Sequence, residues 1–79
     1  MTQKLTLYYF YSCPFCQFVL RYINDRKLDI PMKDTLADAA AKRELLDIGG
    51  KTQVPCLVID GKPLYESQDI INWLEENVS

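Results

Sequence analysis

The 79-residue chain has no histidine and only three cysteines. Without histidine, neither a Cys–His nor a Ser–His nucleophile pair can form. A closed tetrahedral zinc site would need a fourth ligand from an acidic residue or from a second chain, so we do not expect structural zinc. An odd number of cysteines is also untypical of the disulfide framework of a small secreted domain.

The chain also lacks a basic cluster and a long apolar run. Nine Lys and Arg are scattered among eleven Asp and Glu, for a net charge of −2, so we do not expect nucleic acid as a partner. No stretch approaches the roughly 20 apolar residues that span a bilayer, and no signal-peptide core follows Met1. We therefore expect a cytoplasmic protein that does not contact a membrane.

The composition is that of a globular domain, with 48% hydrophobic and 25% charged residues. A chain of this length has room for one hydrophobic core, which predicts a single domain over residues 1–79. No exposed apolar stripe is evident from the pattern. We therefore expect a monomer.

The first half of the chain predicts two strands and two helices. Residues 5–11 are rich in β-formers and predict a buried central strand. The next helix begins at Pro14 and ends near Lys27, with these apolar side chains at helical spacing: Phe15, Phe18, Val19, Tyr22 and Ile23. A short strand at 30–33 precedes a helix at 36–48, capped by Asp34 or Thr35 and ended by Gly49 and Gly50.

The second half predicts a hairpin and a last helix. Residues 54–59 and 62–65 are strand segments joined by the turn pair Asp60-Gly61, and Ser67 is placed to cap the final helix. The full order is βαβαββα, whose β-α-β opening implies two parallel strands joined by a right-handed crossover. The sequence thus predicts an α/β fold, a four-stranded mixed sheet flanked by three helices.

The chemistry centres on Cys13-Pro14-Phe15-Cys16, at the junction of the first strand and its helix. The free N–H groups of a helix start carry partial positive charge and would stabilise a thiolate at Cys13. Pro14 suits the first helical position, and the spacing brings Cys16 within disulfide reach of Cys13. The pattern favours a redox-active dithiol, with a buried cysteine pair or half of a metal site as alternatives.

Together with Thr52-Gln53-Val54-Pro55 and Glu66-Ser67-Gln68-Asp69, this motif resembles the glutaredoxin family over nearly the whole chain. The resemblance implies a thioredoxin-like fold and a glutathione-dependent thiol–disulfide oxidoreductase. Cys13 would be the nucleophile and Cys16 the resolving thiol, acting on protein disulfides and glutathionylated proteins. Glutathione would be the reducing co-substrate, with no permanently bound cofactor and no metal.

The resemblance also implies a cis peptide bond before Pro55. The N–H and C=O of Val54 would then pair with the cysteinyl backbone of glutathione. The residues alone favour a trans proline at the start of an edge strand instead. Lys51 either approaches the thiols or the glycyl carboxylate of glutathione, or is a solvated loop charge.

The segment 66–69 opens the last helix and would offer its N–H groups to the γ-glutamyl carboxylate of glutathione, with Ser67 as the leading contact. An ordinary helix cap explains the same residues. Glutaredoxins usually have two glycines where this chain has Tyr65 and Glu66. Here Glu66-Ser67 is similar to the N-terminal domains of glutathione transferases.

Three further hypotheses follow from these motifs. A [2Fe–2S] carrier would hold its cluster by Cys13 and glutathione from two chains, although Pro14 disfavours it. A transferase-like or interaction domain is suggested by Glu66-Ser67, but these 79 residues contain no helical domain for a second substrate. Cys56 lies in an apolar strand and is predicted to be buried and inert.

Overall fold

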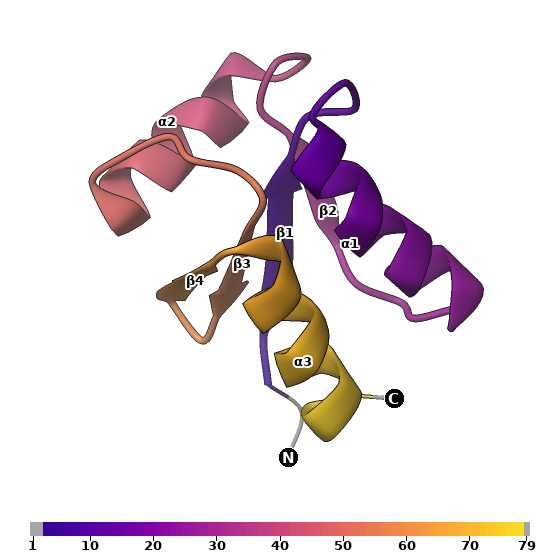
Figure 1. Ribbon diagram of the computed structural model, residues 1–79. Coiled ribbons are helices and arrows are strands. Elements are labelled where there is room, and N and C mark those ends of the chain that lie inside the picture. The colour runs from indigo at the N-terminus through magenta and orange to yellow at the C-terminus, as the bar shows by residue number, and fades with distance from the viewer. Residues whose placement is uncertain (1–2, 79) are drawn as a thin grey trace.

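The strands and helices follow one another in the predicted order βαβαββα in the computed structural model, which describes residues 3–78. The elements are β1 (Leu5–Tyr9), α1 (Pro14–Asp25), β2 (Met32–Asp34), α2 (Ala39–Gly49), β3 (Cys56–Ile59), β4 (Lys62–Tyr65) and α3 (Ser67–Asn77) (Figure 1).

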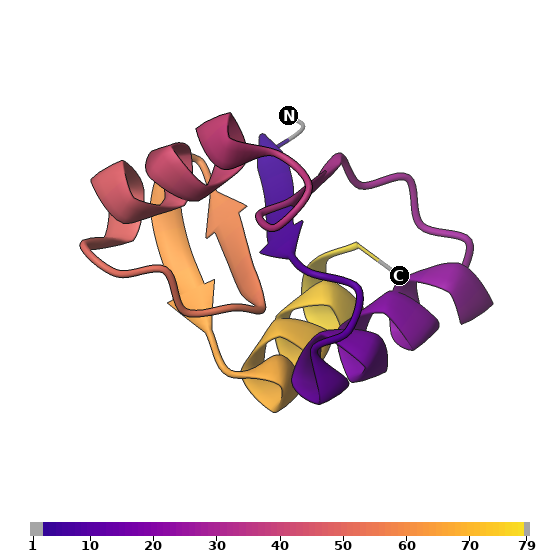
Figure 2. The same cartoon turned by 90° about the horizontal axis from the view of Figure 1, so that it is seen from above.

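The four strands form one mixed sheet in the order β2-β1-β3-β4. β1 pairs in parallel with β2 and antiparallel with β3, and β3 pairs antiparallel with β4. α2 covers one face of the sheet, while α1 and α3 lie side by side on the other (Figure 2). The architecture is that of the thioredoxin-like fold, which confirms the predicted fold class.

The core has two parts because strand side chains alternate between the faces of the sheet. In β1, Leu7 packs with α1 and α3, whereas its neighbour Tyr8 packs with α2. In β3, Leu57 joins the first cluster and Cys56 the second. The hydroxyl of Tyr8 reaches the rim of the sheet, where it donates to Glu44 Oε1 at 3.0 Å.

The start of α2 differs from the prediction. The helix begins at Ala39, and its cap is Asp38, whose carboxylate accepts from the Ala40 N–H at 3.0 Å. Asp34 instead closes the preceding turn, because its Oδ1 accepts from the N–H groups of Leu36 and Ala37. The end is as predicted, since Gly50 caps the helix with a φ of 75°, a conformation that favours glycine.

The apolar face of α1 is also narrower than predicted. Its buried residues are Cys16, Val19 and Ile23, while Phe15 and Phe18 are 62% and 57% exposed. Successive residues of a helix point about 100° apart, so only one stripe of α1 can face the sheet. The expectation that no apolar stripe is exposed is therefore wrong.

The segment that joins β1 to α1 leaves the sheet earlier than predicted. β1 ends at Tyr9, and Tyr11 is 73% exposed in the turn that follows.

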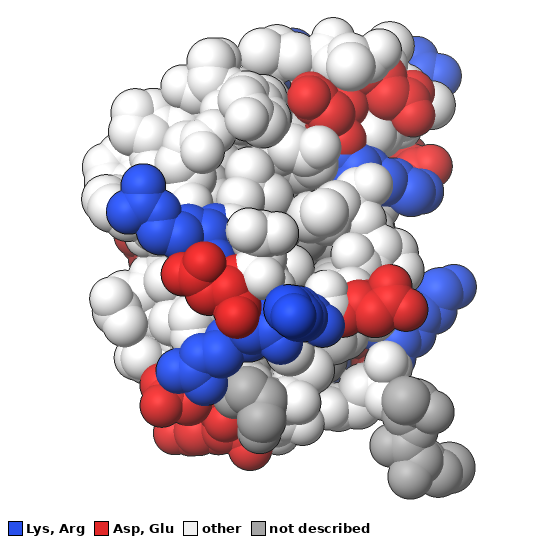
Figure 3. Space-filling view, turned by 90° about the vertical axis from the view of Figure 1, so that its right-hand side faces the viewer, with Lys and Arg blue, Asp and Glu red and all other residues white. Residues whose placement is uncertain are grey.

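Within residues 3–78, no helix has both the length and the apolarity to cross a membrane. On the side of the molecule that carries α1, Lys and Arg are interspersed with Asp and Glu, and the upper left of the view is uncharged (Figure 3).

Candidate functional site

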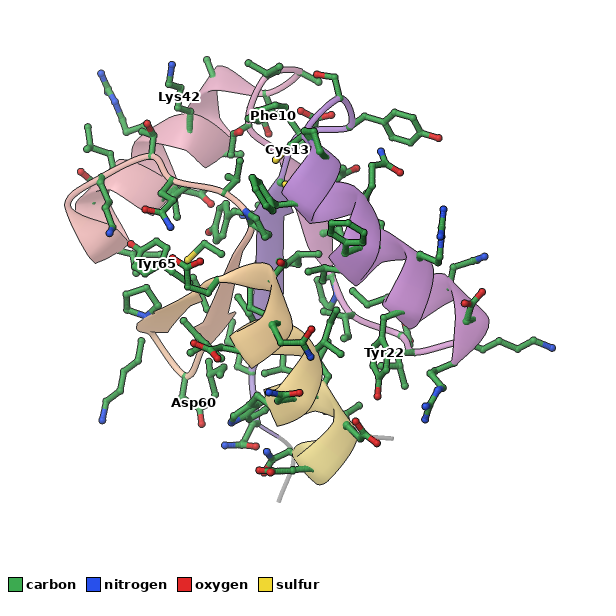
Figure 4. All side chains as sticks on the ribbon, viewed as in Figure 1. Phe10, Cys13, Tyr22, Lys42, Asp60 and Tyr65 are labelled. Atoms are coloured by element: carbon green, nitrogen blue, oxygen red, sulfur yellow. The ribbon has the colours of Figure 1, made fainter. Side chains whose placement is uncertain are left out.

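Cys13 occupies the position just before the first helical residue of α1. Its backbone is extended (φ −76°, ψ 120°), and Pro14 takes the first helical position as predicted. The Cys13 N–H donates to the carbonyl of Phe10 at 3.1 Å, which holds the turn between strand and helix. Figure 4 shows Cys13 beside Phe10 at the upper end of α1. Cys13 is therefore 6% exposed at the positive end of the α1 dipole, and its side chain makes no cap hydrogen bond.

Cys16 lies one turn further along α1 and is fully buried. Burial raises the pKa of Cys16 to about 12, reinforced by a hydrogen bond with the Cys13 side chain and opposed by a backbone hydrogen bond of Phe10. A raised pKa favours the protonated form of Cys16, so this thiol is poorly suited to act as the nucleophile.

The turn in front of Cys13 is tied to α1 by Gln17, which the sequence analysis did not single out. Its side-chain amide donates to the carbonyl of Tyr11, and its backbone N–H donates to the carbonyl of Cys13 at 3.1 Å. A polar side chain one turn after a helix start is the only sequence signal for this contact. Gln17 thus positions the loop that carries the nucleophile candidate.

The Val54–Pro55 peptide bond is cis, which confirms the expectation from the resemblance. Pro55 is buried, and the Val54 backbone makes no hydrogen bond with residues 3–78. Next to this bond lies a cavity of about 300 Å³, the cis-proline cleft, lined by Phe15, Gln53, Val54, Pro55, Glu66 and Ser67. The cleft thus joins the dithiol motif, through Phe15, to the second and third motifs.

The start of α3 differs in detail from the prediction. Glu66 holds the cap position without a side-chain cap bond, and Ser67 is the first helical residue rather than the cap. Glu66 has a φ of 73°, an unusual conformation for a residue with a side chain. The first intrahelical bond runs from the Ile70 N–H to the Glu66 carbonyl, so the preceding N–H groups have no helical partner. Glu66 and Ser67 therefore border the cleft with free donors beside them.

The remaining predicted site residues lie outside this cleft. Gln68 donates to Asn72 Oδ1 at 3.0 Å, and Asp69 is exposed in the first turn of α3. The ammonium of Lys51 lies 4.3 Å from the ring centroid of Tyr65, and Lys51 does not line the cleft. In Figure 4, Tyr65 is well separated from Cys13.

Cys56 is fully buried, as predicted. Burial raises the pKa of Cys56 to about 11, while the Leu64 backbone opposes the shift. Within residues 3–78, no three His, Cys, Asp or Glu side chains are grouped to hold a metal ion. A cluster held by Cys13 would need ligands from glutathione and a second chain, so the iron–sulfur hypothesis stays a prediction.

Comparison with known proteins agrees with these motifs. Residues 7–79 match the family model of the glutathione S-transferase N-terminal domain. Glutathione S-transferase DHAR2 of Arabidopsis thaliana is 38% identical over 66 residues, which cover 82% of this chain and 30% of that protein. The chain thus spans about a third of the length of this curated relative.

Solved structures share the fold over almost the whole chain. Glutathione transferase Omega 3C of Trametes versicolor superposes with a TM-score of 0.78 and 26% identity, covering 96% of this chain and 34% of that one. The thioredoxin-like protein BC3987 gives a TM-score of 0.76 and 29% identity, covering 92% and 97%. Glutaredoxin structures share the same fold. The chain belongs to the glutathione S-transferase N-terminal domain family and has the thioredoxin-like fold of its glutaredoxin relatives.

Proposed function

We propose that this chain is a glutathione-dependent thiol–disulfide oxidoreductase that reduces protein disulfides and glutathione mixed disulfides. The observation that carries the proposal is the inequality of the two thiols. Cys13 holds the cap position at the N-terminus of α1, whereas Cys16 lies one turn inside the helix, where burial raises its pKa to about 12. A nucleophile needs the first environment and a resolving thiol tolerates the second.

With a glutathionylated protein, the Cys13 thiolate attacks the sulfur of the glutathione moiety. A new bond forms between Cys13 and glutathione, the bond to the target protein breaks, and the target leaves as a thiolate that takes a proton from water. A second glutathione thiolate then attacks the glutathione sulfur, which releases oxidised glutathione and restores the Cys13 thiolate. Glutathione supplies both electrons, so this route needs only one cysteine of the chain.

With a protein disulfide, the first attack leaves the target joined to Cys13. Cys16 must then lose its proton and attack Cys13, which releases the target and leaves a Cys13–Cys16 disulfide. Two molecules of glutathione reduce this disulfide. Burial raises the pKa of Cys16, so a base or the departing target thiolate must take its proton during this attack.

The cis-proline cleft is the proposed glutathione site. The backbone N–H and C=O of Val54 are free to pair with the cysteinyl unit as an added strand residue. The N–H groups at the start of α3, beside Glu66 and Ser67, suit the γ-glutamyl carboxylate. A cytoplasm rich in reduced glutathione is the proposed place of action.

The test is a coupled assay with glutathione, glutathione reductase and a glutathionylated peptide. We expect no measurable turnover for Cys13→Ser and retained turnover for Cys16→Ser, because only Cys13 is needed on this substrate. Cys56→Ser is the matched control, since it removes a buried thiol outside the site. Equal rates for wild type and Cys13→Ser would contradict the proposal.

A second candidate is transfer of glutathione to an electrophile. The match to a transferase N-terminal domain favours it. Cys13 would then not be required for catalysis, because the thiolate of glutathione itself is the nucleophile. Mixing the protein with glutathione and a chromogenic electrophile separates the candidates. Conjugation that survives in Cys13→Ser, with no reductase-coupled turnover, would favour the transferase.

A further inference from the structure

α1 carries two apolar stripes, although only one is needed to fold. The core stripe is Cys16, Val19 and Ile23, and it is buried. The second stripe has the same spacing one residue earlier, at Phe15, Phe18 and Tyr22. Phe15 and Phe18 are more than half exposed. Large exposed aromatic side chains in a row are typical of a binding surface.

The second stripe forms one wall of a cavity of about 420 Å³, the α1–α3 groove. The opposite wall comes from α3, where Ser67, Gln68 and Ile71 face the stripe. Arg21 and Asp25 complete the lining on α1. The lining thus combines apolar side chains with one residue of each charge, which suits an uncharged or apolar side chain rather than an anion.

The α1–α3 groove is continuous with the cis-proline cleft. Phe15 and Ser67 line both cavities, and Phe15 lies between the two cysteines in the sequence. A glutathionylated substrate bound through its glutathione in the cleft therefore has the groove beside it for its other half. The groove has eight lining residues, far fewer than the roughly 20–30 per side of a stable protein interface. This size fits a short segment next to one cysteine better than a second copy of the chain.

We propose that the α1–α3 groove binds the leaving half of a glutathione mixed disulfide and selects targets with an aromatic or large aliphatic side chain next to the modified cysteine. This inference rests on the proposed function and specifies its substrate class. In the first step described above, the target thiolate leaves while its apolar neighbour stays on Phe15 and Phe18. The groove therefore acts on the choice of target rather than on the reaction of glutathione.

The test compares two glutathionylated peptides that differ only in the residue before the cysteine, which is phenylalanine in one and serine in the other. Burying one phenylalanine face against the groove is expected to give wild type about a tenfold preference in kcat/KM for the first peptide. Phe18→Ser is expected to reduce that preference to about twofold. Leu36→Ser is the control, since Leu36 is 67% exposed and lines neither cavity.

An unchanged preference in Phe18→Ser, or none in wild type, would overturn the groove proposal while leaving the oxidoreductase function standing. No turnover of either peptide by folded wild type would remove the proposed function and the groove with it. Sedimentation of wild type and Phe18→Ser completes the experiment. A wild-type dimer that Phe18→Ser dissociates, with equal losses on both peptides, would assign the groove to a second copy and overturn the inference.

Discussion

The backbone of Glu66 offers a test that separates strain from ligand binding at the start of α3. Its φ of 73° and ψ of 120° are accessible to glycine and costly for a residue with a Cβ. Strained positions of this kind cost about 1–3 kcal/mol, which a glycine would recover. The greater freedom of glycine in the unfolded chain offsets about 0.5–1 kcal/mol of that recovery. We expect Glu66→Gly to raise the free energy of unfolding by about 1 kcal/mol.

A gain of that size corresponds to a rise in Tm of about 4–8 °C for a domain of this length. Urea unfolding followed by circular dichroism measures the change in the free energy of unfolding directly. Glu66→Ala is the matched control, because it removes the same carboxylate but keeps the Cβ and therefore the strain. If Glu66→Gly were no more stable than Glu66→Ala, the strain argument would be refuted.

The same pair of variants reports on glutathione. Glu66 lines the cis-proline cleft, where its carboxylate would pair with the α-ammonium of the γ-glutamyl unit, so loss of its side chain is expected to raise the KM for glutathione in both variants. A stable Glu66→Gly protein with a raised KM would mean that the side chain is retained for binding at the expense of stability. An unchanged KM in both variants would show that the carboxylate does not contact the ligand.

Three further predictions concern the buried thiols and the contact between Gly49 and Tyr65. Iodoacetamide at pH 8 should label one thiol per folded chain, Cys13, because Cys16 and Cys56 have pKa values of about 12 and 11; mass spectrometry of a second labelled site in the native protein would contradict this. The folded state binds the thiol protons of Cys16 and Cys56 more tightly than the unfolded state does. Their contribution to stability is therefore complete below pH 9.0, the ordinary pKa of a thiol, and is lost as the pH rises toward 11 and 12. Urea midpoints should fall over that range. Gly49→Ala should destabilise the fold by about 1–3 kcal/mol, because the added methyl overlaps the Tyr65 hydroxyl. A Tyr65→Phe background should recover most of this loss, and an equal cost in both backgrounds would exclude the clash.

Local signals in the sequence were sufficient where one element decides the outcome. The Asp60-Gly61 pair predicted the hairpin, and both residues have positive φ values of 50° and 86° that fit the tight turn. Pro14 and Gly50 mark the start of α1 and the end of α2 as predicted. The start of α2 was misplaced because Asp34 and Asp38 carry the same capping signal, and only the fold shows that one closes a turn and the other caps the helix.

The faces of α1 could not be resolved from the sequence. Phe15, Phe18 and Tyr22 have the same period as Cys16, Val19 and Ile23, so periodicity alone assigned all the aromatic residues to the core. The sheet and α3 bury the core stripe and leave Phe15 and Phe18 of the second stripe exposed. Which apolar stripe is buried depends on the neighbours of a helix, and the groove became visible only when they were placed.

By itself the sequence determined the order of elements, the strand–helix junction that carries Cys13, and the family to which the motifs belong, because these depend on local pattern and spacing. The tertiary structure decided what depends on residues far apart in the chain. It brought Phe15, the cis Val54–Pro55 bond and Glu66 around one cleft, and it placed Lys51 on Tyr65 instead. It also buried both thiols, and the desolvation that raises the pKa of Cys16 comes from packing that no local pattern encodes.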